Sequence, residues 1–144
     1  MPRYFTLAQA QAVIPTVEER LRRAVALKGD LAEAATELQN ESERIRLSGG
    51  ALVDRRKLLE AISRRDTSTA HLREVLTAIQ EFGCQVKDLD MGLLDFPTLL
   101  RGEEVCLCWK LGEPEIRFWH GAQEGYRGRK PIDEDFLENH RGDS

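Results

Sequence analysis

The chain has 144 residues, which suits one ordinary domain, and none of its apolar runs approaches the roughly 20 residues that span a membrane. Residues 1–83 carry 13 Lys and Arg against 12 Asp and Glu, while residues 84–144 carry the other 8 against 13, for a net charge of −4. This distribution has no basic footprint, so nucleic acid is not expected as a partner. The start of the chain has no signal-peptide core and the three cysteines are an odd number, so we expect a cytoplasmic location.

Residues 6–83 predict two long helices. Thr6 can cap the first helix, and apolar residues then recur in alternating steps of three and four, as in a coiled coil. Ser48-Gly49-Gly50 ends this helix, Asp54 can cap the second, and Gly83 suits the position after its end. The predicted seam of the first helix consists of Ile14, Val17, Leu21, Ala24, Leu31, Ala35, Leu38 and Ile45, with Lys28 and Ser42 in its gaps.

We expect the two helices to pack as an antiparallel hairpin, and we expect this hairpin to have a partner. The second helix carries an apolar face formed by Leu58, Ile62, Leu72, Leu76 and Ile79. Both faces turn polar midway, at residues 28–30 and 64–69, which indicates a weak coiled coil or a partner contact at that level. The outward apolar residues, Val25, Leu27, Leu59 and Val75, need cover, so we expect a homodimer.

From Cys84 the apolar period changes to two, which is typical of strands. We expect strands in CQVKDL (84–89), LLDFP (ended by Pro97), EVCLCWKL (104–111) and EIRFWH (115–120). The predicted class is α+β: a long, coiled-coil-like two-helix hairpin followed by a small antiparallel meander of three to four strands.

The expected organisation is one domain over residues 1–132, comprising the helical hairpin 6–83, the meander 84–121 and a Gly/Arg-rich loop 122–132. Residues 133–144 are acidic and polar, which predicts a mobile tail.

The stretch VCLCWKLGEPEIRFWHG, residues 105–121, combines residue types found in metal and catalytic sites. A four-residue loop at 112–115 would pair Leu107 with His120 and gather the apolar side chains on one face of the hairpin. His120 would then lie beside Trp109 and Phe118, on the opposite face from the cysteines and Trp119.

This register predicts no metal site and no cofactor, because two cysteines on one strand supply at most half of a zinc site. A three-residue loop would reverse the faces and bring His120 beside Cys106. It is the less favoured register because it would place Arg117 on the apolar face.

Four stretches, RYFTLAQAQAVIPTV, GCQVKDLDMGLLDFP, LCWKLGEPEIRFWH and GYRGRKPI, resemble the bacterial domain-of-unknown-function family 2203. The resemblance runs over nearly the whole chain, is weakest in residues 23–80, and is absent after Ile132. The family pattern VKDLD-x-GL-x-DFP, LCW-x-x-GE-x-EI-x-x-WH and G-x-x-GR-x-P includes Cys108 but neither Cys84 nor Cys106. The family carries no established activity, so the resemblance implies no mechanism.

The ionisable residues of these motifs allow a structural or an enzymatic interpretation. Asp88 and Asp95 flank turns, where carboxylates satisfy backbone N–H groups, and Glu113 lies in the hairpin loop. In an enzyme, Asp88 or Asp95 would hold a hard cation and His120 would act as general base, with Glu113 as a further catalytic candidate.

A small-ligand or anion site is the third interpretation. Lys87 and Arg129 would hold a phosphate or carboxylate, and Trp109 and Trp119 would form an apolar wall. On balance we expect a homo-oligomeric interaction or scaffold module, with a ligand-binding protein or a metal-assisted hydrolase as the alternative. The sequence does not decide whether the protein is an enzyme.

Overall fold

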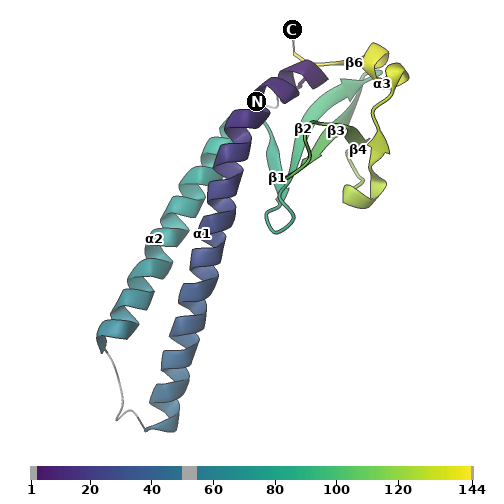
Figure 1. The fold of residues 1–144 in the computed structure, drawn as a ribbon. Helices are drawn as coiled ribbons and strands as arrows, with labels where there is room; N and C mark the ends of the chain where they lie inside the picture. The colour runs from purple at the N-terminus through teal and green to yellow at the C-terminus, as the bar shows by residue number, and fades with distance from the viewer. Residues whose placement is uncertain (1–2, 50–54, 144) are drawn as a thin grey trace. The chain divides into compact units, whose positions relative to one another are not determined.

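The computed structural model describes residues 3–49 and 55–143. The chain divides into two compact units, one of Met1–Arg22 with Leu76–Ser144 and the other of Arg23–Val75. We call the first the β unit and the second the hairpin unit. Two long helices, α1 (Leu7–Leu47) and α2 (Arg55–Glu81), contribute to both units and precede an antiparallel sheet, which confirms the α+β class (Figure 1). None of the described helices is apolar over a stretch long enough to cross a membrane.

The ends of the helices follow from local sequence signals. Thr6 caps α1, because its Oγ1 accepts the Gln9 N–H at 3.1 Å while the Gln9 side chain accepts the Thr6 N–H at 2.9 Å. Gly83 follows the end of α2 with a φ of +96°, a conformation that favours glycine. Both predictions are confirmed, whereas Asp54 and Gly50 lie outside the described residues.

The hairpin unit has a thin internal seam. Its buried side chains are Ala24, Leu27, Ala34 and Glu41 on α1 and Ala61 and Ser68 on α2. The predicted seam is wrong at Ala35 and Ser42, which are exposed, and Leu27, which was predicted to face outward, is buried next to half-buried Lys28. Leu31, Leu38 and Ile45 of the predicted seam are half-buried. Two successive three-residue steps, from Leu21 to Ala24 to Leu27, shift the phase of the heptad so that Leu27 is buried.

The sheet has six strands among the described residues, more than the three to four that the sequence predicts, and two short helical segments lie beside it. The strands are β1 (Gln85–Asp88), β2 (Leu93–Leu100), β3 (Glu103–Lys110), β4 (Phe118–Gly121), β5 (Lys130–Pro131) and β6 (His140–Arg141). The 3-10 turn η1 (Tyr126–Gly128) precedes β5, and α3 (Glu134–Asn139) precedes β6. The order is β1-β2-β3-β4-β5, and β6 pairs with the far end of β2 (Figure 1).

Strand β2 continues through Pro97, although the sequence predicted that it would end there. The Pro97 carbonyl accepts the Phe5 N–H at 2.7 Å on the side of β2 that faces away from β3. The missing N–H of Pro97 lies on that same side, so the ladder between β2 and β3 loses no hydrogen bond.

One face of the sheet carries the apolar core of the β unit. Cross-strand pairing places Phe96, Leu107 and Trp119 in one row on this face. The segment before α1 covers it with Phe5, whose ring meets Phe96 edge-on with centroids 5.3 Å apart. Helix α3 contributes Phe136, whose ring lies 5.2 Å from that of Trp119.

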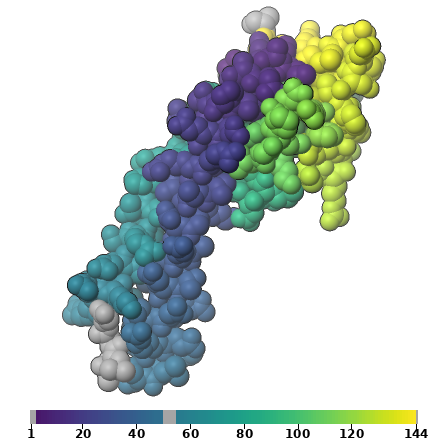
Figure 2. Space-filling model, in the orientation of Figure 1, coloured from purple at the N-terminus to yellow at the C-terminus, as the bar shows by residue number. Residues whose placement is uncertain are grey.

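Residues 133–143 are built into the β unit, so the prediction of a mobile tail is wrong. Asp133 caps α3, Phe136 is buried, and β6 pairs with β2. The His140 Nε2 accepts the Leu7 N–H at 3.0 Å, and thus satisfies a free donor at the start of α1. The tail lies against the N-terminal residues of the chain in Figure 2. The polar composition of the tail does not reveal this packing, because a single aromatic residue, Phe136, makes the buried contact.

Replacing Phe136 with Ala should lower the free energy of unfolding by about 3 kcal/mol, because it removes a buried aromatic ring and leaves a cavity. Leu137→Ala is the matched control, since that side chain is 45% exposed and its loss should change stability by about 0.5 kcal/mol or less. Urea unfolding of the two variants measures the difference. Equal effects would show that α3 does not anchor on the sheet.

Candidate functional site

The face of the sheet opposite the apolar core carries a polar cluster, which we define as Asp95, Cys106, Cys108 and His120. Asp95 on β2 lies opposite Cys108 on β3, and Cys106 on β3 lies opposite His120 on β4. Because directly paired residues share a face, the four side chains lie together on three adjacent strands. Asp95, Cys108 and His120 are each at most 3% exposed, and Cys106 is half-buried.

The predicted register of the β3–β4 hairpin is wrong by one residue. His120 was expected opposite Leu107 and lies opposite Cys106, while Trp119 takes the place opposite Leu107. A one-residue slip exchanges the faces of every side chain on the strand. His120 therefore joins the cysteines, and Trp119 joins the apolar face.

The loop between β3 and β4 explains this register. Glu113 holds the loop in a turn: its N–H donates to the Lys110 carbonyl at 2.9 Å, and its side chain accepts the Lys110 N–H at 2.6 Å. The Ile116 N–H then donates to the Gln11 side chain of α1 at 2.8 Å instead of continuing the ladder. Strand pairing resumes only at Phe118, so Arg117 lies outside the strand. The register found here therefore does not place Arg117 on the apolar face.

Each ring nitrogen of His120 faces one oxygen atom in the interior of the cluster. Its Nδ1 lies 2.8 Å from the Gly121 carbonyl, and its Nε2 lies 3.0 Å from Asp95 Oδ1. A carbonyl oxygen only accepts, so Nδ1 carries a hydrogen. In a neutral imidazole Nε2 then has a lone pair that faces the Asp95 oxygen, and a cation or a proton must lie between the two atoms.

The thiols of the cluster are protonated at neutral pH. Burial, followed by the nearby Asp95 carboxylate, raises the pKa of Cys106 to about 11, although Lys87 opposes the shift. Burial also raises the pKa of Cys108 to about 12, and Asp95 adds to the shift as a charge and as a hydrogen-bond partner. Cys84 lies elsewhere, beside Ile79, and burial raises its pKa to about 11. Without a bound cation these thiols are poor nucleophiles.

Glu113 and Arg129 form a second polar group beside the cluster. Arg129 donates from one nitrogen to both Glu113 oxygens, at 2.6 and 2.8 Å, and the two side chains are 10% and 21% exposed. The guanidinium lies 4.1 Å from the centroid of Phe118 and 4.8 Å from that of Tyr126. This pair ties the loop after β4 to the turn that sets the β3–β4 register.

The other candidate residues serve separate structural roles or lie apart. Asp88 accepts the Met91 N–H at 3.0 Å in the turn between β1 and β2. Lys87 is exposed at a bulge in the β1–β2 pairing. Trp109 is fully buried and donates its Nε1–H to the Glu113 carbonyl, and Trp119 packs against Phe136. The predicted wall of two tryptophans therefore does not form beside Lys87 and Arg129.

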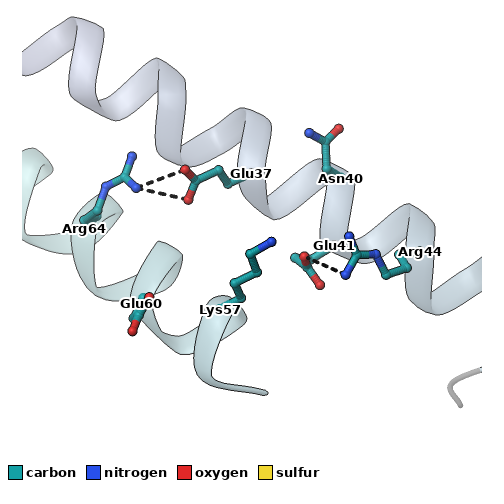
Figure 3. A pocket seen from close by; sticks show the side chains of 7 residues that line it. All are labelled: Glu37, Asn40, Glu41, Arg44, Lys57, Glu60 and Arg64. Carbon is teal, nitrogen blue, oxygen red and sulfur yellow. Dashed lines mark hydrogen bonds and ion pairs between the residues drawn. The ribbon is translucent and has the colours of Figure 1, made fainter. Parts of the chain in front are cut away.

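A cavity of about 320 Å³ lies between α1 and α2 in the hairpin unit (Figure 3). The Glu41 side chain lines this cavity, lies in the seam between the two helices and is 8% exposed. Its Oε1 lies 3.6 Å from the Arg44 guanidinium, and its Oε2 has no hydrogen-bond partner among the described residues. Nearby, Arg64 donates to both oxygens of Glu37 at 3.0 and 3.1 Å. A buried carboxylate oxygen without a hydrogen-bond donor lowers stability, so an additional donor beside Glu41 would stabilise the hairpin.

Stability should fall at alkaline pH because of the three raised thiol pKa values. As pH rises from about 9 towards 11–12, the unfolded chain releases thiol protons that the folded chain keeps, and this favours unfolding. Urea midpoints measured at pH 7, 9, 10 and 11 should decline along this series. The triple variant C84A/C106S/C108A controls for other groups: an equally steep decline in it would contradict the assignment to the thiols.

A double-mutant cycle on Glu113→Ala and Arg129→Ala should give a coupling of about 1–3 kcal/mol, since the pair is largely shielded from water. The Glu124–Lys130 pair is the control, because both side chains are more than 40% exposed and their coupling should be about 1 kcal/mol or less. Urea unfolding of the variants gives both values. A coupling near zero at the buried pair would show that it does not hold the loop.

Comparison with known proteins places the chain in a family. No curated protein and no solved structure matches it. The model of one family, described as an uncharacterized conserved protein (DUF2203), matches residues 3–132. This span contains both long helices, strands β1 to β5 and the whole polar cluster, and the stretches that carried the resemblance all lie within it. The chain therefore belongs to the DUF2203 family of uncharacterized conserved proteins.

Proposed function

We propose that the protein is a cytoplasmic, homo-oligomeric interaction module, in which the hairpin unit pairs with that of a second copy as a coiled-coil-like bundle. The observation that carries this proposal is the contrast between the thin seam of the hairpin unit and its exposed apolar side chains. Leu27 is the one large apolar residue buried among the described residues of this unit, while Val25, Leu47 and Leu59 are 38%, 78% and 59% exposed. Two helices alone leave such side chains without cover, and a four-helix arrangement would bury them.

Buried Glu41 supports pairing with a partner of defined register. Single polar residues in the seam of a coiled coil select register and oligomer state at a cost in stability. In a two-fold dimer each copy would offer the other the same cationic side chains of this level, including Arg44 and Arg64. One of them would supply the donor that Glu41 Oε2 needs.

Two candidate residues of the β unit give little support to the alternative of a ligand-binding or hydrolytic site. Asp88 caps a turn, and Glu113 is paired with Arg129. A ligand site needs polar groups that are available to the ligand. The three cysteines are free thiols, which suits the reducing compartment in this proposal.

Sedimentation equilibrium over a range of protein concentrations tests the proposal. The wild-type chain should be dimeric, and Leu59→Glu should weaken the dimer by at least about 10-fold, because it places a charge in a desolvated contact. Leu137→Glu is the control, since Leu137 is similarly exposed but belongs to the β unit. A monomer at all concentrations, or a dimer that Leu59→Glu leaves unchanged, would contradict pairing through the hairpin unit.

A further inference from the structure

We propose that Asp95, Cys106 and His120 form a binding site for a divalent transition metal ion, with Zn²⁺ as the best match to the three side chains. One ligand atom from each residue, a carboxylate oxygen, the Sγ and a ring nitrogen, lies within 4.8 Å of the other two. The three residues come from adjacent strands β2, β3 and β4, whose backbone hydrogen bonds fix their spacing. A site on sheet strands is held more rigidly than one on loops.

The contact between His120 and Asp95 is the first argument for a cation. Nδ1 carries a hydrogen for the Gly121 carbonyl, so the lone pair of Nε2 is directed at the Asp95 oxygen 3.0 Å away. Two acceptors face each other there unless a positive species lies between them. For a metal ion about 2.0–2.2 Å from both atoms, a tetrahedral angle requires about 3.4 Å between them, so metal binding would move the two side chains apart by about 0.4 Å.

The surroundings of the three residues match those of known metal sites. Metal-binding histidines usually donate their second ring N–H to a carbonyl or carboxylate, as His120 does to Gly121. Cys108 is paired with Asp95 across β2 and β3, so its thiol lies on the same face as the carboxylate. Asp95 and His120 are almost fully buried, whereas Cys106 is half-buried.

The set of ligand atoms selects the kind of metal. One sulfur, one imidazole nitrogen and one carboxylate oxygen suit Zn²⁺ or Co²⁺, while Mg²⁺ and Ca²⁺ prefer oxygen ligands alone. Cys106 would bind as a thiolate, and its proton would pass to the solvent. Three protein ligands leave a fourth tetrahedral position for water, as in catalytic rather than structural zinc sites.

A proton shared between His120 and Asp95 would satisfy the same hydrogen-bond geometry, but it gives Cys106 no role. The test therefore turns on Cys106. Cobalt is the probe, because its visible bands and its thiolate charge-transfer band report tetrahedral coordination that includes sulfur. Co²⁺ is titrated into reduced, tag-free protein, and Zn²⁺ is then added in competition.

The wild-type chain should bind one Co²⁺ per chain with a thiolate charge-transfer band, and Zn²⁺ but not Mg²⁺ should abolish the spectrum. Cys106→Ser should remove the charge-transfer band, and His120→Gln and Asp95→Asn should each weaken binding by about 100-fold or more. Cys106→Ser is a nearly isosteric change at a half-buried position, so circular dichroism should show an unchanged fold.

The controls are Cys84→Ser and His71→Gln, a thiol and an imidazole of the same chain that lie outside the cluster, and both should leave the titration unchanged. The absence of a cobalt spectrum in the wild-type chain would overturn the proposal in favour of a shared proton. A spectrum that survives Cys106→Ser, or that is lost in Cys84→Ser, would overturn it as well. The titration needs no dimer, so it is independent of the test of the hairpin unit.

Discussion

The pairing register of β3 with β4 determines which side chains lie together on each face of the sheet. Side chains alternate between the two faces of a strand, so one residue of slip decides whether His120 lies with the tryptophans or with the cysteines. The register is set outside the ladder, by the turn that Glu113 makes with Lys110 and by the hydrogen bond from Ile116 to Gln11 of α1. Arg129 then fixes Glu113.

The fold class could be predicted from the sequence because it depends on local signals. The capping residues Thr6 and Gly83 act within one helical turn, and the change of apolar period at Cys84 marks the start of the sheet. Register depends instead on partners far along the chain. Gln11 is 105 residues from Ile116, and no pattern within the β3–β4 segment reveals that contact.

Two further errors have causes of their own. The seam of the first helix shifts phase at Leu27, because two three-residue steps occur in succession and a strict heptad count passes over them. The docking of the tail depends on Phe136 reaching Trp119 and on His140 reaching the start of α1. Composition averages over a whole segment, so it does not reveal that one aromatic residue, Phe136, packs into the core.

For the candidate site, residue identities could be predicted but their grouping could not. The chemistry of Asp95 and His120 marks them as candidates, but the register that the sequence favours places Cys106 and Cys108 on the other face. An informative signal was present in the sequence: the alternation of Cys106 and Cys108 beside a strand that carries Asp95. It could be used only once the faces were known.

The family motifs separate into two kinds of residue in the structure. Some build turns: Asp88 caps one, and Gly92 has a φ of +68° and no room for a Cβ, which would lie 2.5 Å from Leu111. Glu113 and Arg129 build the loop that sets the register. Asp95, Cys108 and His120 build no turn, and they converge in the interior of the sheet. Burying a carboxylate beside an imidazole costs stability unless both are well paired, and an apolar pair of similar volume would fold at least as well. The polar cluster is therefore the part of the β unit whose composition folding alone does not explain.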